Sequence, residues 1–385
     1  MSRNMRPWIL SALALVAVVI FGFLSLYRVW FPEGIKIGVI TALSGDQAAY
    51  GRSSKDGIDM AVDRANASGG VNGQRILGCY EDSQGQPKLA VTSFEKLVTI
   101  DKVRFVIGAL ASSDILAIAP IAQRKGIVLI APSATAPAIS MAGDFIFRTA
   151  ASDMYEGTYM ALFAQKELAL RSAVILYINN DYGLGLRDAF AGKFKEMGGA
   201  VVAEMSFAEG EVDFRSLLSK VTALDFDCLY LIGYKELGRL LKQAHELGIG
   251  KQLLSSSMFE DPEILNLAGA VAEGTYFTSQ SFDPNRGGEG LADFASSFDK
   301  KYGRPPDIFA ALSYDATMIL VQALRGAGTT DPEKVKHSLY GIRDYLGVTG
   351  RMSFDANGDV QKEIGIKIVK EGRFEWYRGK QLHEM

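Results

Sequence analysis

Small hydroxyl side chains follow two apolar, strand-like runs in the first half of the chain. Ser112 and Ser113 come after one run, and Ser133 and Thr135 come after the next. Hydroxyls and free backbone N–H groups at the start of a helix bind anions such as carboxylates, because both present hydrogen-bond donors. Such residues also cap helices without binding anything. A third polar loop, which carries Tyr50, is expected at the same sheet edge, and three such loops together favour an anion receptor.

Tyr182 and Tyr234 occupy matching positions in the second half, each just past a strand-like run. A single tyrosine in such a place is commonly part of the core or its rim. Two tyrosines that face a hydroxyl-rich edge suggest an aromatic wall instead. We therefore interpret the pair as a cover over a small solute.

The elements that must position these residues are alternating strands and helices. The alternation runs from residue 35 to residue 150 and restarts after residue 151. This pattern predicts two similar α/β halves, each with a parallel sheet and right-handed crossovers. Open sheets of this kind bind ligands beyond the carboxyl ends of their strands, which is where the polar loops fall.

The last part of the chain reads as two helices followed by antiparallel strands. Asn357 and Gly358 have the sequence of a tight hairpin turn. Asp355, Asn357 and Asp359 also imitate the start of a calcium-binding loop. Position twelve of that loop is Ile366 instead of the glutamate that calcium requires, so the pattern favours a plain turn.

Length and composition narrow the class of protein. With 385 residues the chain is too long for one ordinary core, and two domains are expected. A net charge of −3 without a basic stripe argues against nucleic-acid binding. Cys79 and Cys228, the only cysteines, lie in apolar runs and are expected as buried free thiols. A disulfide between them is the weaker alternative.

Enzyme chemistry has little support in the sequence. The three histidines are scattered, and none has a metal-ligand neighbour at helical spacing. Gly183 and Gly185 follow a strand and open a helix, as in a dinucleotide-binding motif, but the sixth position is Asp188 instead of glycine. Glu204 lies roughly where a ribose-binding acid would fall. An NAD-dependent enzyme is therefore the weakest hypothesis, and no cofactor is expected.

The N-terminus carries an uncharged, largely apolar run at 8–27, which is long enough to cross a bilayer as a helix. Arg3 and Arg6 precede it, and no small-residue cleavage site follows it. We interpret the run as an uncleaved signal anchor, with a cleaved signal peptide as the alternative. Because positive charge ahead of the run keeps that end in the cytoplasm, the rest of the chain is expected outside it.

Taken together, these motifs resemble the leucine/isoleucine/valine-binding protein family over residues 35–377. The stretches that carry the resemblance are "IKIGVITALSGDQAAYG", "ANASGGVNGQ", "VIGALASSD", "IAPSATAP", "FRTAASD", "NNDYGLG" and "IGYKELG". This family comprises extracytoplasmic solute receptors of ABC importers with the type I periplasmic-binding-protein fold. The N-terminal anchor lies outside the resemblance.

The resemblance implies two Rossmann-like lobes joined by three crossings, near 148–152, 278–282 and 347–350. The implied division of the chain is 1–34 for the anchor, 35–149 plus 281–347 for the first lobe, and 150–280 plus 348–385 for the second.

The resemblance also implies roles for the site residues. Ser112, helped by Ser113, and Thr135 would hold the α-carboxylate of an amino acid, and the main-chain carbonyl of Ser133 would accept from its amine. The family's aromatic positions around the ligand match Tyr50, Tyr182 and Tyr234.

One position departs from the family pattern. In amino-acid binders an acidic residue of the second lobe pairs with the ligand ammonium, but the matching position here is Ser257, and the nearest acid is Glu260. If Glu260 faces the ligand, α-amino acids remain the expected class. If it does not, the loss of a charge-assisted bond costs about 1.5–3 kcal/mol, enough to change the ligand class.

The resulting prediction is a solute-binding protein without catalytic activity, anchored on the periplasmic face of the cytoplasmic membrane. Its expected ligand is a small carboxylate, an amino acid of branched-chain type or related, and its expected partner is an ABC permease. A membrane-anchored ligand-sensing subunit that regulates a partner protein is the alternative.

Overall fold

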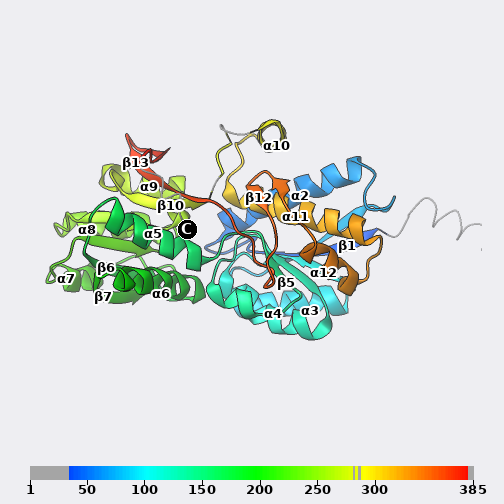
Figure 1. Cartoon of the computed structure of the whole chain (residues 1–385), viewed down its shortest axis with the longest axis horizontal. Helices are drawn as coiled ribbons and strands as arrows, with labels where there is room; N and C mark the ends of the chain where they lie inside the picture. The colour runs from blue at the N-terminus through cyan, green and yellow to red at the C-terminus, as the bar shows by residue number, and fades with distance from the viewer. Residues whose placement is uncertain (1–33, 281, 285–287, 380–385) are drawn as a thin grey trace, which may run out of the picture.

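The computed structural model describes residues 34–280, 282–284 and 288–379. The anchor predicted at 8–27 lies outside these residues. The described chain forms two sheets, each with its own main hydrophobic core. We call the half built on the first sheet lobe 1 and the half built on the second sheet lobe 2; they lie side by side in Figure 1.

The sheet of lobe 1 has five parallel strands in the order β2-β1-β3-β4-β5. They are β1 (Ile35–Thr41), β2 (Ile76–Asp82), β3 (Phe105–Ile107), β4 (Val128–Ala131) and β5 (Ile146–Arg148). Val39, Ile107 and Ile130 are fully buried, as expected where helices cover both faces of a parallel sheet.

The helices of lobe 1 come from two separate parts of the chain (Figure 1). They are α2 (Ala48–Ala67), α3 (Pro87–Thr99), α4 (Ser112–Lys125), η1 (Pro137–Met141), α10 (Glu289–Tyr302), α11 (Ile308–Ala327) and α12 (Pro332–Tyr340). They cover both faces of the sheet, except α10, which packs on the outside of α2 and α11. Among the described helices, α11 alone is long and apolar enough to span a membrane, by length and composition. Most of α11 is buried against α2 and the sheet, so it serves as a core helix.

The sheet of lobe 2 repeats the strand order of lobe 1 and adds two antiparallel strands. Its order is β7-β6-β8-β9-β10, continued by β13 and β14. The strands are β6 (Ser172–Ile178), β7 (Ala200–Phe207), β8 (Cys228–Ile232), β9 (Gln252–Ser255), β10 (Tyr276–Gln280), β13 (Ile364–Lys370) and β14 (Arg373–Trp376). The repeated order agrees with the prediction of two similar α/β halves.

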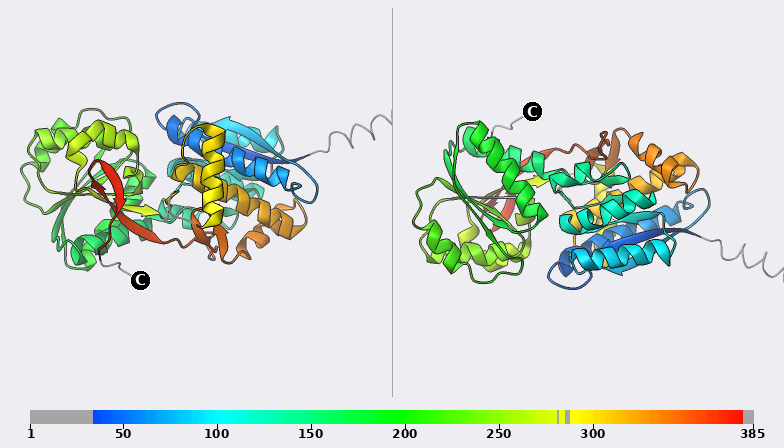
Figure 2. Two further views of the ribbon diagram at one scale, coloured as in Figure 1. Left: turned by 90° about the horizontal axis from the view of Figure 1, so that it is seen from above. Right: turned by 90° about the horizontal axis from the view of Figure 1, so that it is seen from below.

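The helices of lobe 2 alternate with its strands, and the first of them precedes β6. They are α5 (Asp153–Lys166), α6 (Asp181–Glu196), α7 (Arg215–Val221), α8 (Glu236–Glu246), η2 (Ser257–Phe259), α9 (Pro262–Ala268) and η3 (Gly269–Ala272). Figure 2 shows the hairpin β13–β14, in red, against this lobe.

The chain passes between the lobes after β5, after β10 and before β13. The third passage lies further along than the predicted 347–350. The strands β11 (Tyr345–Gly347) and β12 (Gly350–Met352) pair with each other. Met352, Phe354 and Val360 are buried in the core of lobe 1. Residues 348–360, which the sequence assigned to the second lobe, therefore pack on the first.

The turn predicted at Asn357 and Gly358 is present, but it serves a different purpose. It closes an isolated bridge between Phe354 and Val360 in lobe 1. Gly358 has a φ of +77°, and a Cβ there would lie 2.3 Å from the carbonyl oxygen of Ile146. The hairpin of lobe 2 instead turns between Lys370 and Arg373.

Candidate functional site

A cavity lies between the lobes, where the carboxyl ends of both sheets meet. From lobe 1 it is lined by Tyr50, Ser112, Ser133 and Thr135. From lobe 2 it is lined by Tyr182, Tyr234, Ser257 and Glu260. Eight of the nine predicted site residues thus surround one cavity.

The ninth predicted residue, Ser113, is not in the cavity lining. Its hydroxyl oxygen accepts from the backbone N–H of Asp181 at the start of α6, over 3.5 Å. Ser113 therefore links the two lobes beside the cavity.

Several lining residues were not predicted: Gln47, Leu110 and Ala111 lie within the predicted polar loops, and the others come from parts of the chain without such a loop. The whole set is Gln47, Leu110, Ala111, Met258, Ser279, Gln280, Ile308, Phe309 and Leu312. Ser279 and Gln280 end β10, so the rule that ligands bind at strand ends would have found them.

Ser112, the first residue of α4, joins two loops of lobe 1. Its oxygen accepts from the backbone N–H groups of Thr135 and Ala136, each over 3.2 Å. A serine hydroxyl accepts two hydrogen bonds and donates one. With both acceptor sites used, the hydroxyl hydrogen of Ser112 is left to donate to a group in the cavity.

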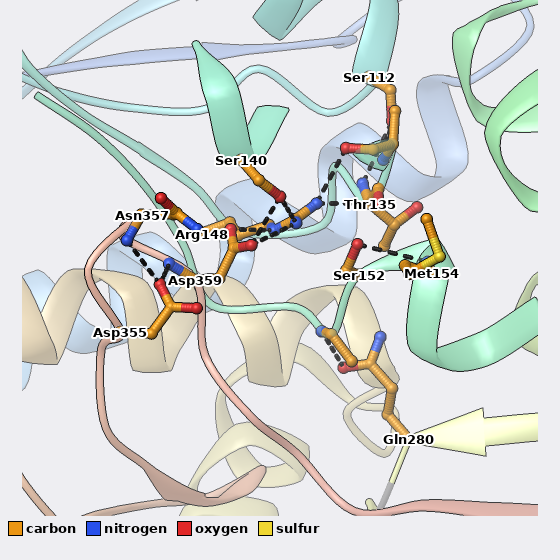
Figure 3. A network of polar contacts seen from close by, with 12 residues as sticks. Ser112, Thr135, Ser140, Arg148, Ser152, Met154, Gln280, Asp355, Asn357 and Asp359 are labelled. Atoms are coloured by element: carbon orange, nitrogen blue, oxygen red, sulfur yellow. Dashed lines mark hydrogen bonds and ion pairs between the residues drawn. The ribbon is translucent and has the colours of Figure 1, made fainter. Parts of the chain in front are cut away.

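Arg148, at the end of β5, fixes the loop that carries Thr135. Its fully buried guanidinium donates to the carbonyls of Thr135 and Ala136, over 2.9 and 3.0 Å. It also donates to the Ser140 hydroxyl over 2.7 Å and forms a two-pronged pair with Asp359, over 2.6 and 2.7 Å (Figure 3). Such pairs fix geometry as well as charge, so this loop of the cavity is preorganised. No local motif signals this role.

The aromatic wall predicted in lobe 2 is present. The rings of Tyr182 and Tyr234 stack with centroids 5.5 Å apart. The Tyr182 hydroxyl shares a hydrogen bond of 2.6 Å with that of Ser256, and the Tyr234 oxygen accepts from Asn180 over 3.3 Å. Burial raises the pKa of both tyrosines well above the usual value, so both stay neutral.

Tyr50 faces this wall from lobe 1. Its ring packs on Phe309 with centroids 4.8 Å apart. Its hydroxyl donates to Asp261 of lobe 2 over 2.5 Å. Burial, followed by the charge of Asp261, raises the pKa of Tyr50. Tyr50 is thus both a cavity wall and a contact between the lobes.

Ser257 is turned toward a buried acid on α5. Its backbone N–H and its hydroxyl donate to the two carboxylate oxygens of Glu156, over 2.6 and 3.0 Å. Thr278 donates to the same carboxylate over 2.6 Å. Burial raises the pKa of Glu156 despite these three donors. Glu156, which was not among the predicted site residues, therefore fixes the position of Ser257 in the cavity wall.

Glu260 lines the cavity, but its carboxylate already has partners. One oxygen accepts from the Ser279 hydroxyl over 2.7 Å. The other is ion-paired with the ammonium of Lys367. A ligand ammonium would thus meet a carboxylate whose charge is compensated.

The lobes contact each other at the mouth of the cavity. Gln47 donates to the carboxylate of Glu209 over 2.7 Å, and the ammonium of Lys235 donates to the carbonyl of Asp46 over 3.1 Å. Burial raises the pKa of Glu209. Together with the Tyr50 contact, these bonds give a closed arrangement of the lobes.

The glycines that imitate a dinucleotide motif are explained by close packing. A Cβ on Gly183 would lie 1.9 Å from the Ile178 carbonyl oxygen, and one on Gly185 would lie 2.4 Å from the Pro137 ring in lobe 1. Asn180 caps α6 by accepting from the N–H of Gly183. Short side chains are needed here because a strand and the other lobe approach the helix.

The described residues give no support for a metal site or for a disulfide bond. None of their His, Cys, Asp and Glu side chains form a group of three that could hold a metal ion. Cys79 and Cys228 are both free, as predicted, but only Cys228 is buried; Cys79 is partly exposed.

Comparison with known proteins now decides the family. The profile of a family described as periplasmic binding protein matches residues 34–367. The chain belongs to that family. This periplasmic binding protein is 31% identical over 365 residues to the leucine-, isoleucine-, valine-, threonine-, and alanine-binding protein of Pseudomonas aeruginosa, and the match covers 94% of each chain.

Two crystal structures resemble this periplasmic binding protein closely. The leucine binding protein LivK of Thermotoga maritima is 31% identical, with a TM-score of 0.84 over 89% of this chain and 97% of that one. LivJ of Streptococcus pneumoniae, solved with isoleucine, is 31% identical, with a TM-score of 0.82 over 89% and 98%. These relatives bind solutes and are not enzymes. The predicted family and the prediction of binding without catalysis are therefore confirmed.

Proposed function

We propose that this periplasmic binding protein is the receptor of an ABC importer and holds an amino acid, of branched-chain type or related, between its lobes. The observation that carries the proposal is the cavity itself. It joins a preorganised edge of hydroxyls in lobe 1 to a wall of aromatic rings in lobe 2.

The ligand's carboxylate is assigned to lobe 1. Ser112 and Thr135 offer hydroxyl donors there, and Ser112 begins the 14-residue helix α4. The partial positive charge of a helix N-terminus favours an anion at that place. We assign the carbonyl of Ser133 to the ligand's amine, and the Ser133 hydroxyl is already used to bond the carbonyl of Leu110 over 3.1 Å.

The ligand's side chain is assigned to the apolar part of the cavity. Met258, Phe309 and Leu312 line this part beside the tyrosines. Apolar surfaces of this kind favour aliphatic or aromatic side chains over charged ones. The relative from Pseudomonas aeruginosa is named as a binder of leucine, isoleucine, valine, threonine and alanine, and LivJ was solved with isoleucine.

Transport would use the motion of the lobes. In the proposed cycle they part about the three passages between them and close on the ligand as rigid bodies. A permease would then recognise the closed, loaded form, because the ligand shifts the population toward it. The apolar run at 8–27 would keep the receptor on the periplasmic face of the membrane.

The test is a ligand screen on the purified full-length protein in mild detergent. The screen adds leucine, isoleucine, valine, alanine, threonine or phenylalanine, each in millimolar excess. At least one of the aliphatic amino acids is expected to raise the melting temperature of the protein by several degrees. The absence of any shift with amino acids, confirmed by calorimetry, would contradict the proposal. The intact mass of the protein from membranes separately tests whether the anchor is retained.

A further inference from the structure

Glu260 is the one charged side chain among the described residues that line the cavity. Its two carboxylate oxygens bond Ser279 and Lys367, as described above. Glu156, which lies behind Ser257, already accepts three hydrogen bonds from Ser257 and Thr278. Lobe 2 therefore presents no uncompensated carboxylate to the cavity from its described lining residues.

Lys367 is held in place from several sides. It lies in β13, opposite Phe277 of β10 and Trp376 of β14. Its side chain is 7% exposed, and its ammonium lies 4.5 Å from the centre of the Trp376 ring. Glu260 is 27% exposed, on the cavity side of the pair. Because the pair is largely buried, solvent and salt screen it weakly.

We propose that Lys367 determines how strongly the site distinguishes an α-amino acid from the same carboxylic acid without its ammonium group. This inference rests on the proposed function. An ammonium that enters the site loses water, and only a free carboxylate would replace that hydration fully. Because Lys367 compensates Glu260, the ammonium adds little to affinity. The ligand class therefore includes carboxylates that lack an ammonium.

The experiment measures, by calorimetry on the full-length protein, the dissociation constants of leucine and of 4-methylpentanoate, which is leucine without its ammonium. Phenylalanine and 3-phenylpropanoate form a second pair. In the wild type, the two members of a pair are expected to bind within about ten-fold of each other, which is about 1.4 kcal/mol.

Variants of the pair separate charge from packing. Lys367→Met keeps an unbranched chain over Trp376 and frees Glu260, so the preference for leucine is expected to rise by about ten-fold or more. Glu260→Gln leaves Lys367 uncompensated, so the preference is expected to shift by a similar factor toward 4-methylpentanoate. The double variant is neutral again and is expected to return to the wild-type ratio, without a buried unpaired charge to destabilise the fold.

Two control variants test whether a distant charge or a change of side-chain packing alone alters the ratio of the two dissociation constants. Lys370→Met removes an exposed lysine from the same strand and is expected to leave the ratio unchanged. Lys367→Arg keeps the charge and is expected to keep the wild-type ratio within about three-fold.

Failure of the inference differs from failure of the proposed function. Two results would overturn the role of Lys367 while leaving amino-acid binding intact. One is a wild type that binds leucine more than ten-fold more tightly than 4-methylpentanoate. The other is a ratio of these two dissociation constants that neither single variant changes. A wild type that binds neither member of either pair, nor any other amino acid, contradicts the proposed function as well.

Discussion

A hydroxyl group in the cavity can bind a ligand only with the donor or acceptor sites that its bonds to the protein leave unused. Ser112 uses both acceptor sites on backbone N–H groups and keeps its hydrogen. Thr135 uses its backbone N–H and carbonyl on Ser112, Arg148 and Asp153. The Thr135 hydroxyl makes none of these backbone contacts, but it lowers the pKa that burial raises in Asp153, so it acts on that buried acid as well as on the cavity.

Thr135→Val is expected to weaken binding of the best amino-acid ligand by about ten-fold, the loss of one hydrogen bond to a charged group. The melting temperature without ligand should change by less than about 3 °C, because valine has nearly the same shape. Calorimetry and thermal melting measure both effects. Thr92→Val, at an exposed position of α3, is the matched control. Unchanged affinity in Thr135→Val would remove the carboxylate site from this loop.

Asp114 gives a prediction about pH. It is buried on α4, and burial raises its pKa to about 7, although the Ser83 hydroxyl lowers it. Between pH 4 and 7 the folded protein keeps this proton while the unfolded chain loses it. The contribution of Asp114 to the free energy of unfolding is therefore full at low pH and falls as pH rises toward 7.

Asp114→Asn removes this dependence. Relative to the wild type, its free energy of unfolding is expected to rise by about 3 kcal/mol between pH 4.5 and pH 8, and to change little above pH 8. Urea denaturation at several pH values measures the difference. Asp225→Asn, at a fully exposed carboxylate, should show no such trend. A constant difference between Asp114→Asn and the wild type would contradict the raised pKa.

At the scale of elements, the ends of strands position the site. The polar residues after β3 and β4 could be placed from the sequence because parallel strands bring their carboxyl ends to one edge. Arg148 could not be assigned its role in this way, because its partner Asp359 is 211 residues away. Lys367 was also missed, since its strand joins the sheet in the antiparallel direction and no local pattern tells which strand it will face.

The same limit explains the misplaced third passage between the lobes. Met352, Phe354 and Val360 are apolar enough to enter either core, and local pattern carries no information about which one. The segment packs on lobe 1 because Phe354 contacts Phe147 there, with ring centres 5.1 Å apart. The ion pair of Arg148 with Asp359 reinforces this choice.

Asp359→Asn is expected to reduce the free energy of unfolding by about 3 kcal/mol, because it leaves a buried guanidinium without its counter-ion. Ligand affinity should fall too, since Arg148 also bonds the Thr135 loop. Urea denaturation and calorimetry provide the two measurements. Glu196→Gln, which breaks an exposed ion pair with Lys193, is the control and should cost less than about 1 kcal/mol. A loss of similar size in both variants would mean that Asp359 does not hold Arg148.

At the scale of the whole molecule, the closed arrangement depends on how near the lobes can approach. Gly185 of α6 allows Pro137 of lobe 1 to lie against the helix backbone, whereas a Cβ on Gly192 of the same helix would meet nothing within 4 Å. Alanine favours a helix over glycine by about 1 kcal/mol at either position. The two positions therefore differ only in their relation to the other lobe.

Gly185→Ala is expected to leave the melting temperature without ligand unchanged or slightly raised, and to weaken ligand binding by about ten-fold or more, because closure is obstructed. Gly192→Ala should raise stability without affecting affinity. Calorimetry gives the affinities, and small-angle scattering shows whether ligand still reduces the radius of gyration. Equal affinities in the two variants would mean that closure does not require this contact.

The position of α11, α12 and β13–β14 late in the sequence has a consequence for biogenesis. Lobe 1 lacks its core helix until residues 308–327 have emerged, and lobe 2 lacks two strands of its sheet until residue 376 has emerged. Neither lobe can therefore complete its core early in export. Nearly the whole polypeptide must thus emerge before either half can complete its core, and the unfinished lobes stay exposed to aggregation and proteolysis until then.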